Sequence, residues 1–202
     1  MSGSIEARVA AAADLETVTG TITFAFAEDP LWGPAMANAR DRHDHRADLW
    51  RGSLAGAMRY PWTWLTEGGG AVSVWIPPSG TEMSAEQEER WLELIRERLG
   101  PGADDFLETL ERFAAAHPHN EPHYYLSLLG THPEHRGRGL GMALLADNLA
   151  RIDAEAMPAY LESTNPGNDH RYASVGFQPF GSFATPYDDH VVNTMWRPAR
   201  VP

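Results

Sequence analysis

The clearest candidate for a functional site is the segment R-G-R-G-L-G at positions 136–141, which is rich in glycine and arginine. It follows an apolar run at 124–129 and precedes leucines at helical spacing, so it forms the turn of a strand–turn–helix unit. The first turn of a helix has unpaired N–H groups and a partial positive charge, which attract anions. Glycine lets a ligand approach the backbone, and arginine adds charged donors. The turn is therefore predicted to bind a phosphate group.

Two common glycine-rich phosphate loops do not match this turn. The dinucleotide-binding fingerprint G-x-G-x-x-G would start at Gly137 and would need glycine at Met142. The P-loop needs Gly-Lys followed by Ser or Thr, which is absent here. The phosphate is therefore expected to belong to another kind of ligand.

The spacing Arg136-x-x-Gly139-x-Gly141, with Pro133 between the strand and the turn, resembles the acetyl-CoA loop of the GNAT acetyltransferases. Further along, L-E-S-T-N-P-G-N at 161–168 and Y-A-S-V-G-F at 172–177 resemble the downstream motif of that superfamily. The two motifs occur in the family's order, about 25 residues apart. The resemblance covers residues 124–180 by motif and the first 120 residues by pattern only. Within the superfamily, the chain is most similar to the puromycin N-acetyltransferase type of antibiotic-modifying enzyme.

This resemblance implies acetyl-CoA as co-substrate and assigns its binding to both motifs. The residues implied are Leu129, Gly130, Thr131, Arg136, Gly137, Arg138, Gly139, Leu140, Gly141, Met142, Asn165 and Asn168. Backbone N–H groups near Leu129 to Thr131 are implied to stabilise the thioester oxygen as it becomes anionic. Asn165 also fits a plain turn role in Asn-Pro-Gly, and Asn168 is well placed to cap the following helix.

Acetyl transfer to an amine also needs a neutral amine and a proton for the departing thiolate. The resemblance gives the second task to Tyr172, because a phenol with a pKa of about 10 can donate to a thiolate of similar basicity. From the pattern alone, a packing role ahead of Gly176 would be the simpler explanation of this tyrosine.

The residue that deprotonates the amine is left open by the sequence. Glu162 is the first candidate, because its strand is implied to end at an opening in the sheet, and a structural hydrogen-bonding role fits it equally well. His123, at the start of the strand before the turn, is the second candidate, and ordered water is a further alternative. On the acceptor side only Trp32 is suggested as a contact, from its place in the loop at 28–34, because tryptophans on strands are more often core residues.

Composition narrows the classes of partner. The pairs His43-x-His45 and His117-x-His119 have no thiolate or acidic cluster at metal-site spacing, so no metal is expected. The absence of cysteine excludes disulfides and a cysteine nucleophile. The net charge of −12 argues against nucleic acid, and no apolar run is long enough to span a bilayer. We therefore expect a cytoplasmic protein, a monomer or homodimer, with neither nucleic acid nor membrane as a partner.

Hydrophobic spacing predicts the elements that position these residues. Strands are expected at 5–10, 61–65, 71–76, 124–129, 157–163, 177–183 and 191–196. Helices are expected from Asp14, at 42–57, after the capping box of Ser84 and Gln87, around 106–113, at 140–152, and around Tyr172. The apolar run at 124–129 is expected to be buried on both faces of the sheet.

These elements predict a mixed α+β fold with helices on both faces of a central sheet. The resemblance implies the GNAT acetyltransferase fold, with a mostly antiparallel sheet that splays open between its fourth and fifth strands. We expect one N-acetyltransferase domain over residues 1–202, with a helical insertion at about 84–116.

The resulting hypothesis is an acyltransferase that moves the acetyl group of acetyl-CoA to a primary amine of a small molecule or peptide. Without a cysteine to form an acetyl-enzyme, direct attack in a ternary complex is the expected route. Two alternatives stay open at this point, a non-catalytic acetyl-CoA-binding module and an acyltransferase that uses a different acyl-CoA.

Overall fold

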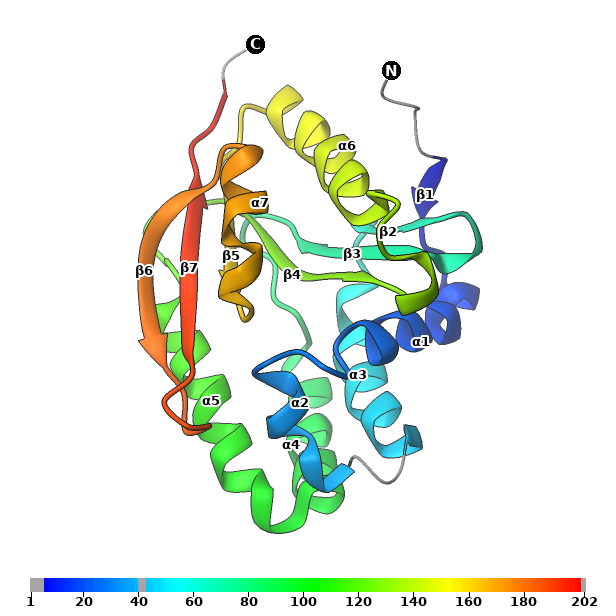
Figure 1. Cartoon of the computed structure of the whole chain (residues 1–202), viewed down its shortest axis with the longest axis vertical. Helices are drawn as coiled ribbons and strands as arrows, with labels where there is room; N and C mark the ends of the chain where they lie inside the picture. Colours follow the sequence, from blue (N-terminus) through cyan, green and yellow to red (C-terminus); the bar gives the residue numbers. More distant parts are fainter. Residues whose placement is uncertain (1–5, 40–42, 201–202) are drawn as a thin grey trace.

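A computed structural model describes residues 6–39 and 43–200 of the chain (Figure 1). Seven strands form one sheet in the order β1-β2-β3-β4-β5-β7-β6 within the described residues. Their bounds are Ala7–Val9, Thr63–Thr66, Ala71–Ile76, Tyr124–Thr131, Ala159–Ser163, Gln178–Ala184 and Val191–Arg197 for β1 to β7. All neighbouring pairs are antiparallel except β4 and β5. The predicted fold class is confirmed.

Seven α-helices accompany the sheet in the described part of the chain. They are α1 Leu15–Ala25, α2 Trp32–Ala35, α3 His43–Ala57, α4 Ala85–Leu99, α5 Ala103–Ala116, α6 Leu140–Ala154 and α7 Asp169–Ser174. Figure 1 shows α6 on one side of β3 and β4, with α1 and α3 on the other. The buried side chains agree, because α6 packs with Trp75 and Leu126 while α1 and α3 pack with Val74 and Leu128.

The sheet opens between β4 and β5, as expected. Their parallel pairing ends at Leu126 and Leu161, whereas β4 continues to Thr131 and stays paired with β3 on its other side. A register shift between Val74 and Trp75 of β3 lies at the same level. Beyond Leu126, one edge of β4 therefore has no strand partner, and its backbone groups are free to bind something else.

Helix α1 crosses this open part of β4 at close range. Its sequence contains several threonines and a glycine, which are poor helix formers, so packing must hold it. Val18 and Ile22 are fully buried. A Cβ on Gly130 would lie 2.9 Å from both Ala25 Cβ and Ile22 Cδ1, so only glycine at this position allows the helix to lie so near the strand.

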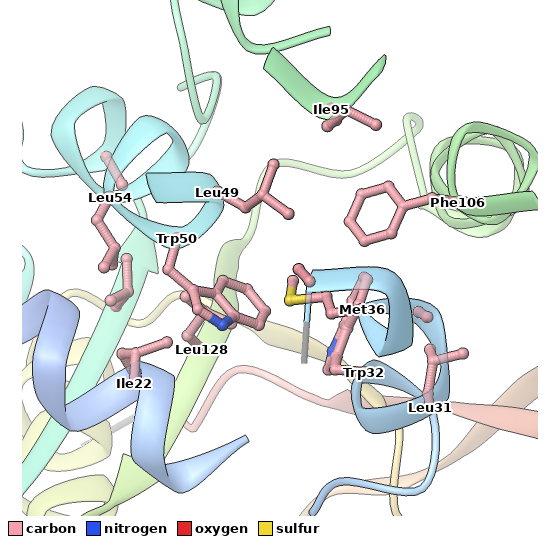
Figure 2. Packing of buried hydrophobic residues seen from close by; sticks show 14 of the residues in the cluster. Ile22, Leu31, Trp32, Met36, Leu49, Trp50, Leu54, Ile95, Phe106 and Leu128 are labelled. Carbon is pink, nitrogen blue, oxygen red and sulfur yellow. The ribbon is translucent and has the colours of Figure 1, made fainter. Parts of the chain in front are cut away.

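The segment between β3 and β4 folds into α4 and α5 through local signals that the sequence shows. Ser84 Oγ accepts a hydrogen bond from the Gln87 N–H at 3.2 Å, and Gln87 Oε1 accepts one from the Ser84 N–H at 3.0 Å, which is the predicted capping box. Gly100, with φ of 52°, ends α4. Figure 2 shows Ile95 of α4 and Phe106 of α5 pointing toward the core formed by α2 and α3.

Helices cover β4 on both faces, because Tyr124 and Leu126 pack on the α6 side and Leu128 packs on the side of α1 and α3. This agrees with the prediction for the run at 124–129, although alternate side chains are only half-buried.

Two other predictions fall partly outside the description. The first strand and the second helix begin at Ala7 and His43 in the structure. Ile5 and Arg42, which were predicted to start them, lie outside the described residues.

Candidate active site

A cavity of about 410 Å³ lies where the open end of β4 meets the start of α6. Its walls come from four segments, namely the end of α1 with the loop after it, the end of β4, the glycine-rich turn with the start of α6, and the β5–α7 segment. The lining residues that bear on the argument are Asp29, Gly130, Gly139, Gly141, Asn165 and Tyr172. The structure thus brings together both motifs that the sequence analysis identified.

The glycine-rich turn presents backbone rather than side chains to this cavity. Gly137 and Gly139 have φ angles of 77° and 74°, a left-handed conformation that glycine adopts without strain. A Cβ at either position would meet no other atom within 4 Å, so both face open space. Gly139 caps α6, and the first hydrogen bond of the helix runs from the Ala143 N–H to the Gly139 carbonyl at 2.9 Å. The preceding N–H groups are therefore available to an anion.

Of the two arginines in the turn, only one lines the cavity. Arg136 lines the cavity, and its Nη2 donates to the Ala25 carbonyl at the end of α1 at 2.9 Å. This bond satisfies an orphan carbonyl of the helix and ties the turn to it. Arg138 is exposed and does not line the cavity, alone among the residues predicted to bind the cofactor. Its contact with the cofactor stays a prediction.

Tyr172 of α7 reaches the same cavity from the opposite wall. Its side chain packs against Phe177, with ring centroids 6.3 Å apart, and burial raises the pKa of the phenol to about 12. The negative charges of Asp29 and Asp169 raise this pKa further. The phenol therefore carries its proton at neutral pH, as a proton donor must.

The two asparagines between β5 and α7 both line the cavity. Asn165 accepts a hydrogen bond from the Gly167 N–H at 3.0 Å and so forms the turn that the Asn-Pro-Gly sequence predicts. Asn168 occupies the N-cap position of α7, but its side chain makes no capping hydrogen bond. The prediction that it caps the helix through its side chain is wrong, and its amide is left to face the cavity.

Glu162 does not line the cavity. It follows the last pair between β4 and β5, and it points to the face opposite α6 because its neighbour Leu161 packs on the α6 side. Its side chain is 2% exposed, and its Oε1 lies 3.6 Å from Nδ1 of His117, which follows α5. Burial, together with the charge of Glu162, raises the pKa values of Tyr125 and Tyr160 well above their usual range. Burial also raises the pKa of the nearby Glu82, which accepts a hydrogen bond from Ser127.

His123, the second candidate base, belongs to this buried polar cluster and not to the cavity. Its Nδ1 lies 2.7 Å from the Glu121 carbonyl oxygen, and its Nε2 lies 3.1 Å from Nε2 of His117. Burial lowers its pKa, because the charged imidazolium loses solvation there.

Trp32 is a core residue in this structure. It is 8% exposed, and its ring stacks on Phe113 at 5.7 Å and lies 5.6 Å from the rings of both Trp50 and Phe106. Figure 2 shows it pointing in among Leu31 and Met36. The side chain does not line the cavity, so its contact with an acceptor stays a prediction.

The family model for GNAT acetyltransferases matches residues 72–177, which is more than half of the 202 residues. The chain belongs to the GNAT acetyltransferase family. The match includes β4, the glycine-rich turn and α6, and it ends just after Tyr172.

Solved acetyltransferases share this GNAT fold along almost their whole length. The histone acetyltransferase HPA2 and related acetyltransferase of Corynebacterium glutamicum has 24% identity, a TM-score of 0.65 and 99% of each chain covered. The polyamine N-acetyltransferase of Drosophila melanogaster has 17% identity and a TM-score of 0.63, over 96% of this chain and 99% of that one. Arylalkylamine N-acetyltransferase 2 of Aedes aegypti has 14% identity and a TM-score of 0.65, over 97% of this chain and 99% of that one.

Several residues that line the GNAT cavity were not predicted from the sequence, namely Ala25, Phe26, Glu28, Asp29, His135 and Arg171. Asp29 accepts hydrogen bonds from the N–H groups of Leu31 and Trp32, both at 3.0 Å, and so caps α2. Its second carboxylate oxygen accepts from the Thr164 hydroxyl at 2.9 Å. Asp29 thereby links the loop after α1 to the end of β5 across the cavity. The cap could have been predicted from the sequence, but the bond to Thr164 spans 135 positions and could not.

Residues 6–39 and 43–200 contain neither a metal-binding cluster nor a helix that could span a membrane. No group of three or more His, Asp or Glu side chains there is arranged to hold a metal ion. None of the helices in that part of the chain has the length and apolar character needed to cross a bilayer.

Proposed function

We propose that this chain is an N-acetyltransferase that transfers the acetyl group of acetyl-CoA to a primary amine by direct attack in a ternary complex. The observation that carries the proposal is the cavity, because it joins a helix start suited to a phosphate, an unpaired strand edge and a protonated tyrosine. The helix start would bind the phosphate of a thioester donor, the strand edge would bind its thioester oxygen, and the tyrosine would supply a proton to the leaving thiolate.

The cofactor-binding role falls to backbone groups. The N–H groups at the start of α6 would hold the pyrophosphate, with Gly137 and Gly139 leaving space for it and Arg136 adding charge. The free edge of β4 near Leu129 to Thr131 would bind the pantetheine arm and the thioester oxygen, since its N–H groups lack a strand partner. Asn165 and Asn168 would contact the same arm from the facing wall.

The proton transfers would be divided between the two faces of the sheet. Tyr172 would protonate the leaving thiolate, which its raised pKa allows because the phenol is protonated beforehand. Glu162 would take the proton from the ammonium group of the acceptor, since its carboxylate lies beside the opening between β4 and β5. With no cysteine in the chain, the amine attacks the thioester directly.

For the acceptor, we propose a small or mid-sized amine with an apolar body, as in the puromycin N-acetyltransferase type. The motif resemblance supports this type, and structural neighbours named for polyamine and arylalkylamine acetylation support an amine acceptor. We also propose that the whole chain is one domain, in which α4 and α5 are an insertion between β3 and β4.

The test has two parts. Millimolar acetyl-CoA should raise the melting temperature, as any ligand selective for the folded state must, and the absence of a shift would contradict the proposal. A panel of primary amines, including arylalkylamines, aminonucleosides, agmatine and polyamines, is then assayed with acetyl-CoA by following free thiol release. A melting shift without thiol release for any amine would instead favour a non-catalytic binding module. Propionyl-CoA, assayed in parallel, tests for a longer acyl donor.

A further inference from the structure

A series of polar side chains connects the buried Glu162 to the protein surface. Glu162 Oε1 faces His117 Nδ1 at 3.6 Å, and His117 Nε2 lies 3.1 Å from His123 Nε2. The His117 side chain is 25% exposed, whereas the Glu162 side chain is 2% exposed. His117 is thus the group through which the buried carboxylate approaches solvent.

The hydrogen bonds determine which nitrogen of each ring carries a proton. The Glu121 carbonyl can only accept, so the His123 Nδ1 at 2.7 Å from it must be the donor. Neutral His123 then has a lone pair on Nε2, and the His117 Nε2 beside it must carry the hydrogen. Neutral His117 therefore has a bare Nδ1, which faces Glu162. His123 sets the tautomer of His117, as the second partner of an imidazole commonly does.

The other ionisable groups around this pair come from four segments. Tyr125 of β4 and Tyr160 of β5 have raised pKa values because of burial, so both phenols stay protonated near neutral pH. Tyr160 donates to the Ala116 carbonyl at 3.3 Å. Glu82, from the β3–α4 loop, has a raised pKa for the same reason. His119 and Glu121, in the α5–β4 loop, both act electrostatically on His123, and the His119 ring lies 5.8 Å from the His117 ring.

We propose that His117 carries protons between Glu162 and solvent, and that His123 positions His117 for this task. The proposal rests on the proposed function, in which the acceptor ammonium supplies the proton. An N–H bond of the ammonium breaks and its proton moves to the Glu162 carboxylate, whose O–H proton then passes to His117 Nδ1. The imidazolium then gives its Nδ1 proton to water and keeps the Nε2–H that donates to His123, so the starting tautomer returns. Both residues end each cycle unchanged.

The first experiment reads the tautomers on the protein without any substrate. Long-range proton–nitrogen correlations of ¹⁵N-histidine-labelled protein should show the Nε2–H form for His117 and the Nδ1–H form for His123. Resonances are assigned with His117→Gln and His123→Gln. A neutral His117 with its proton on Nδ1 would overturn the relay whatever the activity, because that nitrogen could then not accept a proton from Glu162.

The second experiment uses an amine found in the panel. His117→Gln should lower kcat by about tenfold or more with little change in KM, and the loss should be reversed by adding imidazole buffer. The matched control is His119→Gln, an exposed histidine of the same loop, which should behave as wild type. Unchanged kcat in His117→Gln, or a loss that imidazole does not restore, would overturn the relay. If no amine is acetylated, the proposed function is wrong. The tautomers of His117 and His123 then still test whether the two rings have the hydrogen-bonding arrangement that the relay requires.

Discussion

The two sides of the opening between β4 and β5 are built in different ways. On one side, the cavity is made largely of backbone, with Gly137, Gly139 and the first N–H groups of α6 facing open space. On the other side, the cluster around Glu162 is made of side chains, and its carboxylate is almost fully buried. A backbone-built site suits an anion that must approach closely, whereas a side-chain cluster suits proton transfer.

The electrostatics of the two sides differ accordingly. At the cavity, the helix start and Arg136 favour negative charge. In the cluster, the buried carboxylates favour positive charge, and burial shifts several pKa values. A phosphate-bearing donor and a cationic acceptor would therefore be attracted to opposite sides of the opening in the sheet. Four variants, each with a matched control, test this division.

Tyr172→Phe removes the proposed proton donor on the cavity side and keeps the ring. The turnover rate should fall by about 10²–10⁴-fold, with acetyl-CoA affinity and stability almost unchanged. Tyr187→Phe is the control, because burial also raises the pKa of this half-buried tyrosine to about 12 and it does not line the cavity. A Tyr172→Phe enzyme within about threefold of wild type, with chemistry rate-limiting, would remove the tyrosine from the mechanism.

Trp32→Ala tests whether Trp32 is a core residue or a contact of the acceptor. The unfolding free energy should fall by about 3–5 kcal/mol, because a large cavity replaces the indole. Chemical denaturation measures this loss, and half-buried Trp62→Ala should lose less. If the milder Trp32→Phe changed KM for the acceptor without changing stability, Trp32 would be an acceptor contact after all.

Glu162→Gln tests the buried side by removing the proposed base while keeping its shape. The rate of acetylation should fall by about 10²-fold, while the melting shift produced by acetyl-CoA stays the same. Glu82→Gln is the matched comparison, since Glu82 is the other carboxylate near Tyr125. A large loss in Glu82→Gln with little loss in Glu162→Gln would mean that the base had been assigned to the wrong carboxylate.

Gly139→Val should weaken acetyl-CoA binding about tenfold or more, because its side chain would occupy the space in front of the helix start. Gly68→Val is the control for backbone strain. Gly68 also has a positive φ, 64°, and open space around it, and it lies away from the cavity. Both variants should lose some stability, and only the first should lose affinity, as measured by calorimetry. Equal affinity losses would show that the turn does not contact the cofactor.

Most of the helices and strands, and most of the residues that line the cavity, could be predicted from local sequence patterns and the family resemblance. The strand–turn–helix unit, the capping box at Ser84 and the Asn165 turn depend on residues close together in the chain, so their spacing predicts their geometry. Glycines with a positive φ angle can be predicted in the same way, because few other residues adopt that conformation. The resemblance then supplied the mostly antiparallel sheet and its opening between the fourth and fifth strands.

Contacts between distant segments could not be predicted from the sequence. The bond from Asp29 to Thr164, the contact of His117 with Glu162, and the place of Trp32 in the core join segments that are far apart in sequence. No local pattern encodes such pairs, because each of these residues has several plausible neighbours until the sheet and helices are assembled. The face to which each β4 side chain points was likewise decided by the register shift against β3, which places Leu126 and Leu128 in different core clusters. Burial, and with it the direction of each pKa shift, exists only once the chain has folded.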